Sequence, residues 1–202
     1  MRLYVESNFL LEIVLDQEQS EYCRDILDAS LRGTIELGIP AFSVLESYHA
    51  LDGKHKSRAK VHGDLQIELR QLGRARSYQN QTEALRDVSQ ILLSTAEAER
   101  IRIEAVRLRI EEHVNVFPLT DVVLAKAGYY QHLYALSAQD ATVLASVVLD
   151  LESSGGNESV FVTRNSKDFG DPDISALLGE RGCRLMFGFD DTVSLLRSRG
   201  LV

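Results

Sequence analysis

The sequence SVFVT, at Ser159–Thr163, is the clearest buried strand of the chain. It is a short, nearly continuous apolar run, which is typical of a strand covered on both faces of a parallel sheet. A helical pattern that begins at Ser137 and runs to about Leu151 precedes it, and the short run RLMF at Arg184–Phe187 follows it as a further strand. This half of the chain therefore predicts a parallel sheet with helical connections.

Strands and helices alternate through the rest of the chain in the same way. Further strands are expected at 2–5, at 34–39 before Pro40, and at 114–119. Helical spacing recurs at 9–14, at 20–31 with Ser20 as N-cap and Gly33 as the stop, at 42–51, after Thr120, at 174–178 and at 192–196. Gly155–Asn157 is expected to form a turn. This order predicts an α/β fold, a three-layer α/β/α sandwich with a mostly parallel central sheet.

A long charge-rich segment interrupts the alternation at about 54–113. It has helical periodicity without a strand pattern, and we expect two helices, the first ending near Gly73 and the second starting near Gln81. The sequence thus predicts a single domain over residues 1–202 with a long helical insertion.

Composition limits the classes of function. An apolar share of 45% and a charged share of 26% are ordinary for a globular protein with a full core. The net charge of −8 argues against a protein that grips nucleic acid over its whole surface, but a carboxylate site filled by a metal is compatible with it. We find no membrane span or signal peptide, and expect a cytoplasmic protein with Cys23 and Cys183 as buried thiols.

Acidic and amide side chains follow the predicted strands. Glu6 stands directly after the first strand, and Asn165 follows the SVFVT strand by two residues. Glu46 lies one turn into the helix after the second strand, Asp140 lies in the first turn of the helix opened by Ser137, and Asp168 follows Asn165 by three residues. In open parallel sheets the site lies beyond the carboxyl ends of the strands, so these side chains are expected to converge.

Four segments containing these residues resemble the PIN domains, a family that includes the ribonuclease toxins of bacterial toxin and antitoxin pairs. They are LYVESNFLLEI from Leu3, FSVLESYHAL from Phe42, LSAQDATVLASV from Leu136 and FVTRNSKDF from Phe161. The resemblance covers about residues 1–52 and 114–190. Any one segment is a weak signal, whereas their order and the final TRNxxDF are fairly specific together.

The resemblance implies an acidic cluster that binds Mg²⁺ or Mn²⁺ and hydrolyses RNA phosphodiesters. Its catalytic residues are Glu6, Glu46, Asp140, Asn165 and Asp168, of which the first three hold the metal; Asn8, Thr163 and Arg164 contact bound water or phosphate. Independently, hard oxygen ligands suit these two ions, and crowded carboxylates are costly without a cation. The ion polarises the phosphoryl oxygen and activates a water.

Two departures from the family pattern predict a slow or inactive enzyme as an alternative. Glu6 stands where the family usually has Asp, which places the carboxylate one methylene further out and favours Mn²⁺ over the geometrically stricter Mg²⁺. Asn165 stands where most members have Asp, and the loss of a charge weakens a second metal site. A degenerate PIN-fold module that binds RNA or a partner protein is therefore the competing hypothesis.

Partners are predicted more coarsely. Single-stranded RNA is the favoured substrate because splayed bases can enter a cleft. Seven basic residues between Lys54 and Arg76 bind phosphate or form a solvated helix face. The insertion serves as a lid, a homodimer surface or an antitoxin-docking face, and Tyr129, Tyr130 and Tyr134 pack internally or at a dimer interface.

Overall fold

The computed structural model describes residues 1–154 and 158–202, apart from the side chains at positions 83, 84 and 86–88. The turn predicted at Gly155–Asn157 lies outside the described residues. The chain divides into two compact units, one formed by Met1–Ser47 and Val106–Val202 and the other by Tyr48–Ala105. We call them the sheet unit and the hairpin unit.

The sheet unit is built on a parallel sheet, as the sequence predicts. In the described part of the chain its order is β3-β2-β1-β4-β5, and each neighbouring pair is parallel. The strands are β1 (Arg2–Tyr4), β2 (Glu36–Pro40), β3 (Asn115–Phe117), β4 (Ser159–Val162) and β5 (Cys183–Met186). The predicted strands are confirmed, with bounds shifted by one or two residues.

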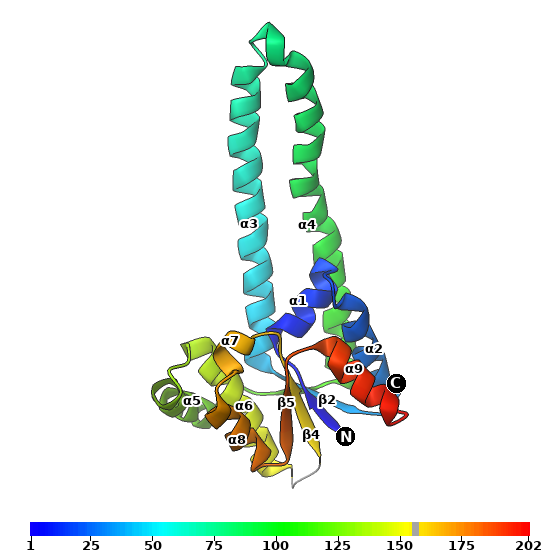
Figure 1. The fold of residues 1–202 in the computed structure, drawn as a ribbon, viewed down its shortest axis with the longest axis vertical. Helices are drawn as coiled ribbons and strands as arrows, with labels where there is room; N and C mark the ends of the chain where they lie inside the picture. Colours follow the sequence, from blue (N-terminus) through cyan, green and yellow to red (C-terminus); the bar gives the residue numbers. More distant parts are fainter. Residues whose placement is uncertain (155–157) are drawn as a thin grey trace. The chain divides into compact units, whose positions relative to one another are not determined.

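Helices connect the strands and cover both faces of the sheet (Figure 1). They are α1 (Ser7–Leu15), α2 (Ser20–Leu31), α3 (Ala41–Leu72), α4 (Gln79–His113), α5 (Asp121–Leu133), α6 (Ala138–Ser153), α7 (Ser166–Phe169), α8 (Pro172–Gly179) and α9 (Phe189–Ser198). Thr120 and Ser137 cap α5 and α6 as predicted, each accepting a backbone N–H with its hydroxyl. Ser20 was expected to cap α2, but it is the first helical residue, and Gln19 stands at the cap.

The core lies in two layers because side chains alternate across each strand. Leu3 and Val160 contribute to one cluster, with buried residues of α1, α2 and α9. Tyr4 and Phe161 contribute to the other, with α5, α6 and α8. Both faces of the central strands are thus buried, and the α/β/α sandwich predicted from sequence is confirmed.

Cys23 and Cys183 are free and buried, as expected. Burial raises the pKa of both thiols, that of Cys183 to about 12. Both therefore act as small apolar side chains in the core. Among the described residues, no helix combines the length and the apolar character needed to cross a membrane.

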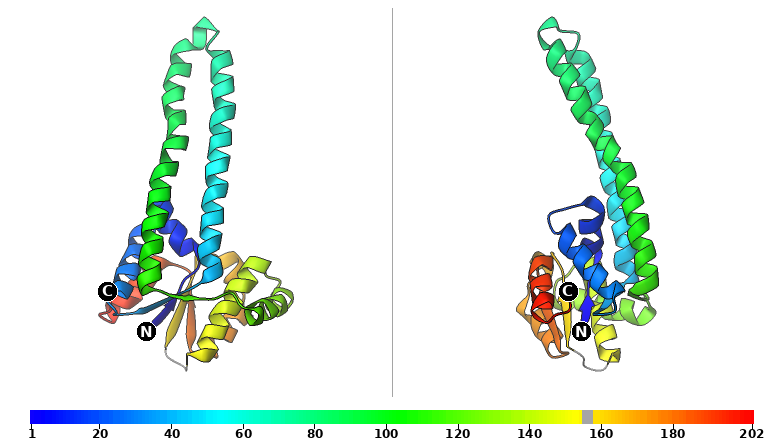
Figure 2. Two further views of the ribbon diagram at one scale, coloured as in Figure 1. Left: turned by 180° about the vertical axis from the view of Figure 1, so that it is seen from behind. Right: turned by 90° about the vertical axis from the view of Figure 1, so that its right-hand side faces the viewer.

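The hairpin unit consists of two antiparallel helical stretches, which lie side by side in both views of Figure 2. They belong to α3 and α4, and the chain reverses near Gly73, where the break was predicted. The expected separation between the helix at 42–51 and the first helix of the insertion was wrong, because α3 continues without interruption to Leu72. Gly53 weakens a helix but does not end it when flanking turns remain hydrogen-bonded.

Polar side chains fill much of the contact between these helices. Glu99 is 3% exposed. It accepts from Arg58 Nη1 at 2.7 Å and pairs with His55 Nε2 at 2.8 Å. Closer to the tip, the Nδ1 of His62 lies 3.0 Å from the carbonyl of Ser89. These paired groups define how the two helices align, because a shifted register leaves buried charge unpartnered.

Candidate functional site

The predicted site residues lie at the carboxyl ends of β1, β2 and β4. Glu6 follows β1 as the N-cap of α1, Glu46 lies in the second turn of α3 after β2, and Thr163 follows β4. Parallel strands send these segments to the same edge of the sheet. Asp140 comes from the first turn of α6. The topology therefore gathers side chains from distant parts of the sequence.

Glu6 is the most heavily hydrogen-bonded of these groups and is only 5% exposed. Its Oε1 accepts from Asn8 Nδ2 at 2.5 Å and from Thr163 Oγ1 at 2.7 Å. Its Oε2 accepts from the Ser7 hydroxyl at 2.9 Å and from the backbone N–H of Asn8 at 3.3 Å. Four donors occupy the lone-pair directions of an ionised carboxylate, so Glu6 ties β1 to the end of β4.

A chain of hydrogen bonds continues from Glu6 to Asp140. Thr163 Oγ1 accepts from the backbone N–H of Asn165 at 2.9 Å. The amide Nδ2 of Asn165 then donates to Asp140 Oδ1 at 3.0 Å. The Ser137 hydroxyl donates to Asp140 Oδ2 at 2.5 Å, while it accepts the backbone N–H of Asp140 as the helix cap. Each Asp140 oxygen keeps a free lone-pair direction.

Glu46 lies in the electrostatic field of the other two acids. Burial raises the pKa of its carboxyl most strongly, and the charges of Glu6 and Asp140 raise it further. Proximity of the Ser7 hydroxyl, whose single proton also serves Glu6, lowers it. The shift in the pKa of Glu46 therefore reflects chiefly the burial of its carboxyl, and repulsion by the other two acids adds a smaller contribution.

The remaining predicted residues occupy different surroundings. Asn8 belongs to the Glu6 network, and Asp168 lies half-buried on α7, outside the described chain of hydrogen bonds that links Glu6 to Asp140. Arg164 forms an ion pair with Glu12 and approaches Glu18 at 3.6 Å. The bond to Glu12 raises the pKa of the guanidinium. Its predicted contact with substrate therefore requires exchange of these partners.

Glu12 was not singled out from sequence, although it is 2% exposed. Besides pairing with Arg164, it accepts the backbone N–H of Gln19 at 3.0 Å. A signal was available: Glu12 lies between the apolar residues Leu11 and Ile13 on a short helix, and a carboxylate so placed needs a cationic partner if buried. Which arginine serves it depends on the sheet topology.

The donor chemistry suits a hard divalent ion, with a restriction. Among the described residues, no three acidic, histidine or cysteine side chains are grouped closely enough to hold one ion together. Mg²⁺ usually keeps several waters and binds through one or two carboxylates, completing its shell with substrate phosphate. Of the three predicted metal ligands, Asp140 and Glu46 keep free acceptor capacity, whereas Glu6 accepts from four donors. Asp140 and Glu46 fit such an ion, whereas Glu6 can join only by releasing a present donor.

The larger described hollows lie away from the carboxylates. One of about 460 Å³ is lined by Ser159, Cys183 and Arg184 at the amino ends of β4 and β5. The acid of its lining, Glu158, forms an ion pair with Arg199, and burial raises the pKa of the Cys183 thiol. The carboxylate edge is therefore the stronger candidate site, because its side chains can supply chemistry.

Comparisons with protein-family models, with curated proteins and with solved structures found no match. The likeness to PIN domains rests on the four sequence segments and on the position of their acids at one sheet edge. It stays a prediction.

Proposed function

We propose that this protein is a divalent-metal-dependent endoribonuclease of the PIN type. The observation that carries the proposal is the placement of Glu6, Glu46 and Asp140 beyond the carboxyl ends of a parallel sheet, where hydrogen bonds connect Glu6 through Thr163 and Asn165 to Asp140. Three acids drawn from three distant segments raise the energy of the ionised site, and a bound cation offsets that cost. The likeness of the surrounding segments to PIN domains supports RNA as the polymer that is cut.

Each side chain has a part that its contacts support. Asp140 and Glu46 hold Mg²⁺ or Mn²⁺, which supplies Lewis-acid stabilisation of the phosphoryl oxygens and a more acidic water. Glu6 adds a third negative charge to the site. Its carboxylate positions Thr163, and Thr163 in turn orients Asn165. Asn165 holds Asp140 and presents an amide at the edge where a phosphate oxygen can bind. Asp168 and Arg164 contact the substrate only if their side chains first move from their present positions.

The partners follow from the same proposal. Single-stranded RNA is the substrate, an antitoxin protein and a second copy of the chain are candidate protein partners, and the location is cytoplasmic. Two free, buried cysteines are compatible with a reducing compartment.

A second candidate is a catalytically degenerate module of the same fold that binds RNA or a partner protein. The specific observation in its favour is the saturation of Glu6 by four donors, since a ligand that must first break hydrogen bonds binds metal weakly. Asn165 also favours the degenerate module, because an amide contributes no negative charge to a metal site.

Asp140→Asn separates the two candidates. It should reduce Mn²⁺-dependent cleavage of single-stranded RNA at least about 100-fold, because a ligand charge on the ion is lost. Asp173→Asn is the matched control, since Asp173 also lies in the first turn of a helix and loses the same helix-dipole interaction. The control should retain activity within about twofold.

Stability of the metal-free proteins completes the test. Relative to Asp173→Asn, the Asp140→Asn variant should melt at the same or a higher temperature, because one of several crowded anions is removed. Equal cleavage by wild type and Asp140→Asn sinks the nuclease proposal, and so does cleavage that persists in excess EDTA. Absence of cleavage by wild type, with RNA binding retained, selects the degenerate module.

A further inference from the structure

The tip of the hairpin unit differs in charge from the rest of the chain. Residues 69–82 contain three arginines, Arg70, Arg74 and Arg76, and no aspartate or glutamate, in a protein of net charge −8. Amides accompany them, and Gln71, Gln79, Asn80 and Gln81 are all exposed. Side chains of this kind bind phosphates and sugar hydroxyls rather than an apolar partner.

The turn that carries these residues is held by hydrogen bonds. The backbone N–H of Gly73 donates to Leu69 at 3.0 Å, and that of Ala75 donates to Leu72 at 2.9 Å. The N–H of Tyr78 donates to Ala75 at 3.0 Å, which closes the short 3-10 turn at Arg76–Tyr78. A Cβ at position 73 would lie 3.1 Å from the backbone carbonyl of Leu69, so glycine suits the tight turn that ends α3.

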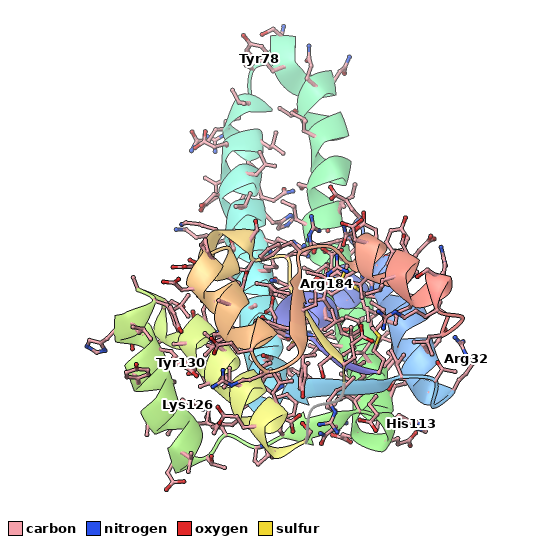
Figure 3. The ribbon with its side chains drawn as sticks, turned by 60° about the horizontal axis from the view of Figure 1, so that its bottom comes forward. Arg32, Tyr78, His113, Lys126, Tyr130 and Arg184 are labelled. Carbon is pink, nitrogen blue, oxygen red and sulfur yellow. The ribbon has the colours of Figure 1, made fainter. Side chains whose placement is uncertain are left out.

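Tyr78 stands on this turn with 52% of its surface exposed, and Figure 3 shows it at the end of the hairpin. Arg74 and Arg76 are exposed as well, and among the described residues neither has an ion-pair partner. Arg164, Arg197 and Arg199 in the sheet unit each pair with an acid. The tip arginines thus keep their full charge for an external anion.

We propose that the hairpin tip is a second RNA-binding surface, on which Arg74 and Arg76 contact phosphates and Tyr78 stacks on an unpaired base. An aromatic ring beside arginines is the combination that suits single-stranded nucleic acid, because stacking requires an unpaired base. The assignment of RNA as the polyanion rests on the proposed function. The binding itself requires neither the metal nor the carboxylate edge.

Binding is therefore measured on the full chain in EDTA, where cleavage cannot interfere. The probe is a fluorescent single-stranded RNA about 20 nucleotides long, followed by anisotropy over a range of KCl concentrations. Arg74→Gln/Arg76→Gln should weaken binding at least about tenfold near 0.1 M salt and lower the salt slope by about 1.4, the share of two phosphate contacts on a single strand.

Two matched comparisons isolate the tip. Arg32→Gln/Arg184→Gln removes two charges from exposed arginines at the C-cap of α2 and on β5, both labelled in Figure 3, and should change affinity less than about twofold. Tyr78→Ala should weaken binding about tenfold, whereas Tyr78→Phe should bind as wild type does, because the ring and not the hydroxyl stacks.

The outcomes distinguish this surface from the nuclease proposal. Equal losses in the tip and control pairs mean a general charge effect and overturn the tip assignment, as does wild-type affinity in Arg74→Gln/Arg76→Gln. Failure of wild type to bind RNA in EDTA also overturns it. If the tip variants weaken binding while wild type never cleaves with Mn²⁺, the surface stands and the nuclease proposal fails. Loss of binding to a protein partner with RNA affinity unchanged assigns the tip to that partner instead.

Discussion

The seam of the hairpin unit mixes apolar and polar buried side chains, whereas the two core layers of the sheet unit are apolar. In the sheet unit, apolar residues fill both layers, and Phe161 packs edge to face on Phe169 with ring centroids 5.3 Å apart. In the hairpin unit, the contact between two helices includes the buried Glu99 with Arg58 and His55. Two helices alone offer a narrow seam, so apolar burial is limited and paired polar groups set the register.

The difference teaches where chemistry can be held in place. A sheet covered on both faces holds its strand ends in place. Side chains that directly follow those ends are therefore held in place as well. The hydrogen-bond chain from Glu6 through Thr163 and Asn165 to Asp140 lies on that frame. The hairpin instead presents a turn with charged side chains, which suits contact with a flexible polymer.

The largest expected effect is a loss of stability caused by a substitution in the core of the sheet unit. Phe161→Ala should lower the free energy of unfolding by about 4 kcal/mol, because it removes a fully buried ring and leaves a cavity between two layers. Chemical denaturation followed by circular dichroism measures it. Phe187→Ala is the control, since that ring is 41% exposed and should cost far less. Similar losses in both variants would show that β4 does not anchor the core.

Breaking the polar seam of the hairpin should cost somewhat less. Glu99→Ala leaves Arg58 and His55 without their shared acid and should cost about 3 kcal/mol, seen as faster amide exchange within Tyr48–Ala105. Glu97→Ala, two residues away and exposed, should stay within about 0.5 kcal/mol of wild type.

Replacing His55, Arg58 and Glu99 together by leucine sharpens the same comparison. Since no charge is then left unpaired, the triple variant should recover the stability lost in Glu99→Ala. Unchanged amide exchange in Glu99→Ala contradicts the register-setting role of the seam.

The fold could be predicted from sequence where local signals agree with the tertiary structure. SVFVT is apolar on both faces because both faces of β4 are covered, and Ser137 lies three residues before the Asp140 N–H that it caps. The continuity of α3 could not be predicted in this way. Gly53 resembles a helix end in sequence, but α3 continues past it, and His55 on the far side pairs with Glu99 of α4.

The sequence predicts at which edge of the sheet the site lies, but it does not predict the hydrogen bonds and ion pairs that its side chains form. The rule for parallel sheets indicates the edge on which Glu6, Glu46 and Asp140 gather, and their mutual influence on the pKa of Glu46 agrees with it. The hydrogen bond from Thr163 to Glu6 and the ion pair between Arg164 and Glu12 each join residues more than 150 positions apart. Sequence spacing contains no information at that scale.

The smallest expected effect concerns Glu46 and depends on pH. Its folded-state pKa is raised above the ordinary value of 4.5, so ionisation opposes folding once pH exceeds that value. Any stability that the protonated carboxyl contributes is complete below pH 4.5 and is lost as pH rises through the raised pKa. Metal-free Glu46→Gln should therefore melt slightly above wild type at about pH 7, and the difference should vanish near pH 4.5.

Manganese should reverse the order of stability of wild type and Glu46→Gln, and this reversal tests whether Glu46 binds the ion. At about pH 7 the ion binds the ionised carboxylate and should stabilise wild type more than Glu46→Gln, and this gain should fade on acidification because protons compete with the metal. Differential scanning fluorimetry with and without Mn²⁺, at both pH values, measures the four combinations. Glu97→Gln, an exposed position in the hairpin unit, controls for the loss of one charge. If metal-free Glu46→Gln is instead less stable than wild type at neutral pH, the carboxylate is a structural partner, and the repulsion that supports a metal centre at the sheet edge is absent.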